Sequence, residues 1–277
     1  DFTASWAIAN DWSIPTTVER SGRVVVMSND EQADSLTVSW RFPWRHVFLT
    51  DKLSTILEWR LTQHWGGWSD REVETLHAII GVNDYERASY PRDRVKLLLR
   101  ERDGMTAIAL DGARFAVGDL VARTQVQLVG DESWALALRV DLKAPIGSRT
   151  AAGGSGGWDA GIGITASVQL APLLVAHGLA SLAAWTRLPD GFPLQPRRWH
   201  ASVEGSLVFR MGEWAFLIED RVVSPLFESG WRVVTDGDRV SWAVNAFAVF
   251  YPHNQVALGL RRAGVTLWFA EDVTPGR

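Results

Sequence analysis

Apolar and polar residues alternate along long stretches of this chain. In "ESWALALRVDLKAP", residues 132–145, apolar side chains recur at every second position from Trp134 to Leu142. Arg139, Asp141 and Lys143 occupy positions between them. Because successive side chains of a strand point to opposite faces, this segment has one apolar face and one charged face.

The same period of two recurs along the whole chain and predicts an all-β, antiparallel protein. The expected strands are 2–11, 34–42, 53–65, 94–102, 105–110, 117–128, 132–143, 158–170, 173–185, 199–211, 213–223, 238–250, 254–261 and 264–270. Many of them exceed the usual length of about 5–6 residues. Strands of this length are typical of a large sheet or barrel.

The connections between these strands alternate in length. The long ones are 12–33, 66–93, 144–157, 186–198 and 224–237, whereas turns such as 102–104, 129–132 and 171–172 are short. Long loops at one end and short turns at the other are typical of an up-and-down outer-membrane barrel. We therefore expect a single transmembrane β-barrel domain over 1–277, of about 12–14 strands, with both termini at the periplasmic, short-turn end. A soluble β-sandwich or lipocalin-like barrel is the alternative fold.

Tryptophan is abundant, with 15 Trp against 3 Tyr. Many of these residues fall at or near the ends of expected strands, where a membrane barrel carries aromatic girdles at the lipid head groups. The predicted girdle consists of Trp12, Trp40, Trp65, Trp134, Trp158, Trp185, Trp199, Trp214 and Trp268. The apolar strand faces would then meet lipid. Carbohydrate binding by these rings is the alternative interpretation.

Composition narrows the classes of function. The net charge of -4 gives no reason to expect a nucleic-acid partner. The absence of cysteine excludes a thiolate nucleophile and cysteine-ligated metal. We expect a bacterial outer-membrane location, with membrane lipid as partner, other envelope proteins as further candidates, and no cofactor.

Several segments in chain order resemble an uncharacterised bacterial family, domain of unknown function three-one-eight-seven. The most specific is "HWGGWSDREVETLHAIIGVNDYERASYPRDRV" at 64–95, with "GDL" at 118–120, "LKAPIG" at 142–147 and "GGSGGWD" at 153–159. Shorter matches are "ESG" at 228–230 and "ED" at 271–272. The resemblance implies an outer-membrane-type β-barrel of Gram-negative bacteria without an established activity.

Charged and polar side chains opposite the apolar faces are predicted to line the lumen. They are Glu58, Arg60, His64, Lys96, Arg100, Arg123, Arg139, Asp141, Glu204, Arg210, Glu213 and Glu219. Mixed signs suit either a salt-bridged plug or a narrow polar path. The first hypothesis is a narrow channel or transporter for a small solute, gated by 66–93. The second is a non-conducting structural or scaffold subunit of an envelope assembly.

The segment "SDREVETLHAIIG", 69–81, predicts the one short helix, with Ser69 and Glu72 as a capping box and Gly81 as its end. Glu72, Glu74 and His77 belong to this loop helix, which we expect on or in the barrel mouth. Glu74 and His77 have the spacing of a metal-binding Glu-x-x-His pair. That site needs further ligands on other helices, so we expect no metal.

A membrane-embedded serine hydrolase is a further alternative. His177 and Ser181 on one strand are about 13 Å apart, and His200 and Ser202 about 7 Å, too far for a nucleophile–base hydrogen bond. A cross-strand pair stays open. We place His177 on a lipid-facing surface and expect no catalytic activity. The "GGSGG" run at 153–157 lacks the ending of a phosphate loop and predicts a flexible extracellular loop.

Overall fold

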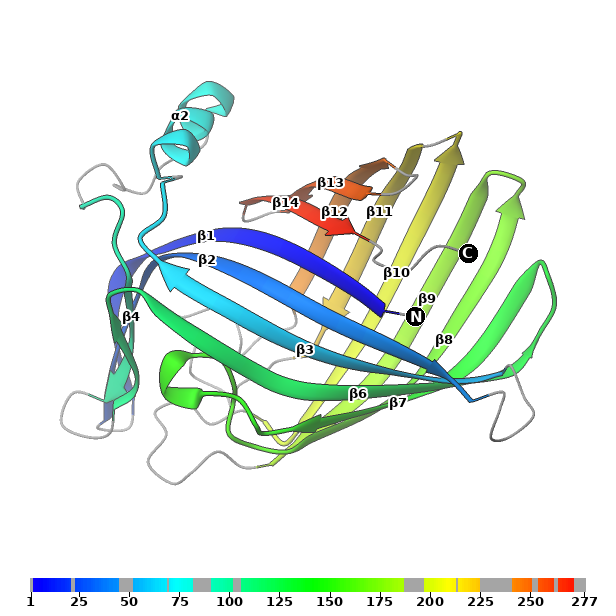
Figure 1. Ribbon diagram of the computed structural model, residues 1–277, viewed down its shortest axis with the longest axis horizontal. Helices are drawn as coiled ribbons and strands as arrows, with labels where there is room; N and C mark the ends of the chain where they lie inside the picture. Colours follow the sequence, from blue (N-terminus) through cyan, green and yellow to red (C-terminus); the bar gives the residue numbers. More distant parts are fainter. Residues whose placement is uncertain are drawn as a thin grey trace.

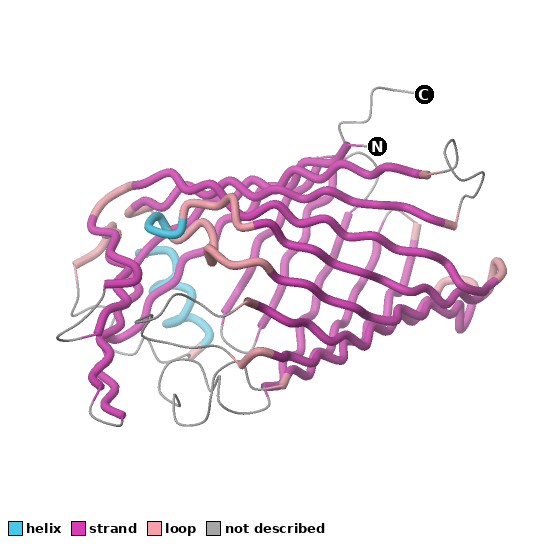
Figure 2. Tube along the Cα trace, turned by 90° about the horizontal axis from the view of Figure 1, so that it is seen from below, coloured by secondary structure: helices cyan, strands magenta, loops and turns pink. Residues whose placement is uncertain are grey.

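The computed structural model is an antiparallel, strongly curled sheet (Figure 1). It describes residues 2–20, 23–44, 52–68, 70–81, 91–101, 106–186, 197–212, 214–224, 241–250, 254–261 and 264–271. Figure 2 shows the sheet from below, with strands running side by side along its wall. No helix in this part of the chain is long and apolar enough to cross a bilayer.

The strand bounds agree closely with the predicted ranges from β6 onward. Their bounds are β1 Phe2–Arg20, β2 Arg23–Pro43, β3 Leu53–Trp65, β4 Lys96–Glu101, β5 Thr106–Asp111, β6 Arg114–Gly130, β7 Trp134–Ala144, β8 Asp159–Ala171, β9 Leu174–Trp185, β10 Trp199–Met211, β11 Trp214–Val223, β12 Ser241–Phe250, β13 Asn254–Arg261 and β14 Gly264–Glu271. One helix, α2, spans Asp70–Ile80, and a 3-10 turn, η2, spans Arg149–Ala151. The prediction of an all-β, antiparallel barrel with one short helix is confirmed.

The sheet closes on itself through its first and last strands. β1 pairs with β14 from Ala4 opposite Glu271 to Ile8 opposite Leu267, and its other edge pairs with β2. The pairing order therefore forms a ring of twelve described strands, β1, β2, β3 and β6–β14, because β3 pairs directly with β6. Phe2 lies opposite Trp40, so the chain enters the ring at the end where β2 turns into β3.

The loop predicted at 12–33 is instead a long two-stranded ribbon, so that prediction is wrong. β1 and β2 continue their pairing to Arg20 opposite Arg23, with one irregularity between Ser13 and Thr16. The sequence of this ribbon is rich in β-branched residues, "TTV" and "VVV", around a Ser-Gly pair typical of a tight turn. These residues favour a hairpin that continues beyond the ring.

β4 and β5 branch from the ring instead of forming part of its wall. β4 pairs with the β2 ribbon from Val25 opposite Glu101 to Asp30 opposite Lys96, and β5 adds to its other edge. Their prediction as wall strands is wrong, because a free ribbon edge offers backbone partners as good as those of the ring. Where this hairpin meets η2 and β6, a small apolar core contains the buried Val95, Leu99, Leu110, Ala116 and Ala151.

Outside that core, large apolar side chains face outward from the ring. On β8, Ile162, Ile164 and Val168 are exposed, and Ile164 is 51% accessible. The residues between them, such as Thr165 and Ser167, face inward and are less accessible. A wall with its apolar side outside and its polar side inside is the reverse of a soluble barrel.

Candidate functional site

Four charged side chains on three adjacent strands form a network on the inner wall. Arg123 of β6 lies between two carboxylates, with its Nη1 3.4 Å from Glu58 Oε2 and its Nε 3.3 Å from Asp141 Oδ1. Arg139 Nε is 2.9 Å from Asp141 Oδ2. Register explains these contacts, since Arg123 is directly opposite Asp141. The predicted lumen residues Glu58, Arg123, Arg139 and Asp141 thus come together as a charge-balanced group.

A second cluster lies on β6, β7 and β8, nearer the end of the wall that carries the long loops. Lys143 Nζ is 2.9 Å from Asp119 Oδ2 and 2.5 Å from Asp159 Oδ2. The backbone N–H groups of Gly147 and Ser155 each donate to the Asp119 carboxylate at 3.0 Å. Asp119 therefore pairs with the Lys143 ammonium of β7 and also anchors the connection between β7 and β8.

The connection at 144–157 is hydrogen-bonded to the inner wall, and the run at 153–157 that the sequence predicts to be a flexible loop is part of this anchored segment. Ser148 exchanges hydrogen bonds with the Val117 backbone, donating from N to the Val117 carbonyl at 2.8 Å and accepting from Val117 N at 2.9 Å. A Cβ at Gly153 would lie 2.2 Å from Val117 O, and one at Gly154 would lie 2.4 Å from Asp119 Oδ1. The glycine run is needed here for close backbone approach, not for flexibility.

Replacing Gly154 by valine should expel this loop from the wall, because its Cβ has no space beside Asp119. Trypsin cleavage after Arg149, followed by mass spectrometry of the folded protein, measures the release. Gly161→Ala is the matched control, since a Cβ there meets Asp141 Cβ at an ordinary 3.6 Å. Equal cleavage of the two variants would contradict the anchoring role.

A cavity of about 470 Å³ lies against the inner wall from β6 to β11. Side chains that line it include Gln125, Arg139, Thr165, Ser167, His177, Leu179, Glu204, Ser206, Glu219 and Arg221. Ala166, Gly178, Gly205 and Asp220 also border it, but they alternate with these residues and therefore belong to the outward-facing set. Most of the inward groups are polar.

One side of the cavity is formed by β10 and β11. Arg221 Nε lies 3.0 Å from Glu204 Oε1, and the two residues are directly opposite one another. Ser202 Oγ donates to the same carboxylate oxygen at 3.4 Å and lies 2.7 Å from Ser181 Oγ. Glu204, which the alternation predicts to face the lumen, is thus charge-paired with Arg221.

His177 faces the lumen, and its prediction as a lipid-facing residue is wrong. Its Nδ1 lies 2.7 Å from Ser167 Oγ on the adjacent strand, and both residues border the cavity. The misassignment arose because Val175 and Leu179 share the face of His177 and made that face look apolar. The register set by the short turn at 171–173 is the signal that would have corrected it.

The other predicted lumen residues separate into three groups. His64 is buried on the inner wall, with its Nδ1 2.6 Å from Glu31 Oε2, while Arg60 and Arg210 face inward by alternation and are exposed. Lys96 and Arg100 lie on β4, which branches from the ring, so their prediction as lumen-lining residues is wrong. Glu213 lies outside the described residues.

Most of the predicted girdle residues lie near one of the two ends of the wall. Trp40, Trp134, Trp158, Trp199 and Trp214 are exposed, with Trp199 at 62%. Trp65 is less accessible, and Trp185 stacks on His200 at a centroid distance of 5.4 Å. Trp12 lies within β1 and not at its end, because the ribbon continues. The side chains of Trp12 and Trp268 lie outside the described part of the structure.

Helix α2 matches its prediction in extent, and Gly81 ends it with φ of 71°. Glu74 accepts hydrogen bonds from Arg92, and this carboxylate raises the pKa of the Arg92 guanidinium. Buried Asp70 accepts from the Asp93 N–H at 2.8 Å. These contacts tie α2 to the segment that follows it, and Figure 1 shows the helix standing beyond the end of β3.

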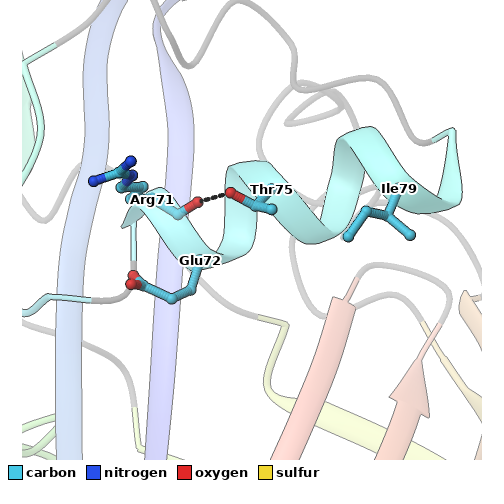
Figure 3. A pocket seen from close by; sticks show the side chains of 4 residues that line it. All are labelled: Arg71, Glu72, Thr75 and Ile79. Carbon is cyan, nitrogen blue, oxygen red and sulfur yellow. Dashed lines mark hydrogen bonds between the residues drawn. The ribbon is translucent and has the colours of Figure 1, made fainter.

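The surface of α2 carries an open hollow of about 400 Å³, lined by Arg71, Glu72, Thr75 and Ile79 (Figure 3). Glu72 is exposed, and the side chain of His77 is outside the described set. The described residues contain no group of three His, Cys, Asp or Glu side chains that could hold a metal ion. Glu74 is engaged by Arg92, which gives it a structural role.

Several residues of the inner wall were missed at the level of sequence. Asp119, Ser167, His177, Ser206 and Arg221 all contribute to the cavity or to the anchored loop. Glu31 was hidden by the assignment of 12–33 to a loop. For Asp119, a bulge between Trp59 and Leu61 opposite β6 shifts the alternation and obscures which residues face inward.

A closed, antiparallel β-wall with an outward apolar face and an inward charged face is the fold of outer-membrane β-barrels. The chain belongs to the family described as "Protein of unknown function (DUF3187)", whose model matches residues 2–231. This confirms the family resemblance seen in the sequence. No curated protein matches the chain.

Several solved structures match the chain at low sequence identity. The COG4313 outer membrane channel from Pseudomonas putida F1 is 12% identical, with 98% of this chain and 94% of that chain covered and a TM-score of 0.57. LpxR from Salmonella typhimurium is 8% identical, with coverages of 98% and 99% and a TM-score of 0.46. OmpF from Salmonella typhi, in complex with daunomycin, is 8% identical, with coverages of 98% and 96% and a TM-score of 0.36. The first of these likenesses shows the barrel fold.

Proposed function

We propose that the protein is an integral β-barrel of the bacterial outer membrane that gives a small solute a narrow path through a charged lumen. The observation that carries this proposal is the combination of an apolar outer wall with a polar internal cavity of about 470 Å³. The fold shared with an outer membrane channel supports it.

The height of the outward apolar band supports a membrane location. From Trp158 to Leu170, one strand advances about 40 Å along its axis, or about 30 Å along the normal at the usual barrel tilt. Both residues are exposed. This height is close to the apolar band of about 25 Å in outer-membrane barrels. The outward tryptophans at both ends would then form the two girdles.

The two ends of the barrel differ in a way that favours one orientation. Short turns follow β6, β8 and β10, whereas the connections after β3 and β7 are long. Outer-membrane barrels place short turns in the periplasm. Since β1 enters the ring at the short-turn end, we place both termini in the periplasm.

A non-conducting structural barrel is the second candidate, and the Glu58–Arg123–Asp141–Arg139 network favours it. A balanced ion-pair network can hold a wall together without leaving charge for a solute. We infer no catalytic activity: among the described residues, no third group forms a hydrogen bond with the His177 ring to orient it against Ser167.

Conductance of the purified protein in planar lipid bilayers separates the two candidates. The channel proposal predicts discrete conductance steps, and Arg139→Ala or Glu204→Ala should change their size because each alters a charged lining group. Glu132→Gln, in the exposed turn after β6, is the control and should conduct as the original protein does. Absence of steps in correctly folded protein would favour the structural candidate.

A further inference from the structure

A row of polar side chains crosses the cavity wall at one height. Register places Ser167 of β8 opposite His177 of β9, His177 opposite Ser206 of β10, and Ser206 opposite Glu219 of β11. All four residues border the cavity. Adjacent strands are about 4.8 Å apart, so the backbones of His177 and Glu219 are separated by about 10 Å, with a hydroxyl between them.

The charges that line the cavity do not balance. Arg139 is compensated by Asp141 at 2.9 Å, and Arg221 by Glu204 at 3.0 Å. Glu219 is the exception: among the residues that the structure describes, no cation lies within ion-pair distance of its carboxylate. Within the described part of the chain, the Glu219 carboxylate is therefore the one charge of the polar row without an opposite charge at contact, and it faces the cavity.

We propose that Glu219 and its row form a binding site for small organic cations of the protonated-amine class. The Glu219 carboxylate supplies the opposite charge, and the hydroxyl oxygen of Ser206, directly opposite on the adjacent strand, can accept a hydrogen bond from the same ammonium group. If the barrel conducts, as proposed above, this site makes it select cations over anions. The transport consequence rests on the proposed function, whereas binding itself does not.

Binding is tested by NMR on protein with isotope-labelled histidine in detergent micelles, with methylammonium as the probe. The His177 imidazole, assigned from a His177→Gln variant, should shift in a saturable manner because the cation lies in the same row. Glu219→Gln should weaken the apparent affinity by about fivefold or more, the effect of one unit charge near contact in a water-like medium. Glu132→Gln should bind as the original protein does, and acetate should give no saturable shift.

Reversal potentials under a potassium chloride gradient test the transport consequence. We expect a cation preference in the original protein that Glu219→Gln reduces by a similar factor. A channel that conducts without such a preference would overturn the inference, as would a His177 signal that does not respond to methylammonium or responds equally in Glu219→Gln. Intact binding without any conductance would support the site and overturn only the channel proposal.

Discussion

Replacing Ile164 by arginine should prevent stable assembly of the barrel. Ile164 lies mid-strand between Leu138 and Ala180 on the outward face and is exposed. In a membrane, that exposed surface meets hydrocarbon, where an arginine near the midplane costs about 2–4 kcal/mol. Such a cost is a large fraction of the net stability of a typical protein. Heat-modifiable migration and urea unfolding from lipid vesicles would measure the loss.

Two control variants change either the depth of the arginine in the bilayer or the face of the strand on which it lies. Leu170→Arg places the same side chain on the same face, near the strand end, where the cost should fall to about 0–1 kcal/mol. Thr165→Arg moves the charge by one residue to the inner face and should allow assembly. If Leu170→Arg were as damaging as Ile164→Arg, the outward wall would not be in contact with a bilayer of this depth.

Replacing Lys143 by methionine should be the second most damaging change. Its ammonium lies between Asp119 and Asp159, whose side chains are only 7% and 22% accessible. Breaking a buried ion pair costs about 3–5 kcal/mol, and partial hydration of this cluster reduces the expected loss to about 2–4 kcal/mol. Urea unfolding of the folded protein would give the value.

A double variant distinguishes electrostatic loss from loss of packing. Adding Asp159→Asn to Lys143→Met removes one of the two unpaired carboxylates and should recover part of the lost stability. Asp111→Asn, on the exposed surface of β5, should have no such effect. Absence of recovery would mean that Lys143 stabilises the wall through its packed methylene groups.

The wall could be predicted from the sequence because each of its faces meets a different medium. β8 was expected at 158–170 and lies at Asp159–Ala171, since Ile162 and Ile164 alternate with glycine and threonine. The same reasoning failed for β9, where Val175, Leu179 and Ala183 turn apolar side chains into the lumen. Alternation predicts the strand in both cases. Which face points into the lumen can be predicted only where one face is clearly apolar and the other clearly polar.

The inner site was harder to predict because it depends on register. Glu58, Arg123 and Asp141 were found as inward charges, but their contacts follow from which residues lie opposite one another. The pairing of Ser167 with His177 depends on the length of a single turn. The role of Gly154 depends on tertiary contact with Asp119, for which a glycine-rich stretch gives no local signal.

The direct pairing of β3 with β6 makes everything between them an insertion into an otherwise continuous meander. His64 and Arg114 are cross-strand partners, so the chain leaves the wall and returns to it at adjacent backbone positions. A short hairpin turn between β3 and β6 could replace the whole intervening segment without altering the register of any strand in the ring. The helix and the branching hairpin can therefore diverge, shorten or be exchanged between relatives while the barrel beneath them stays the same.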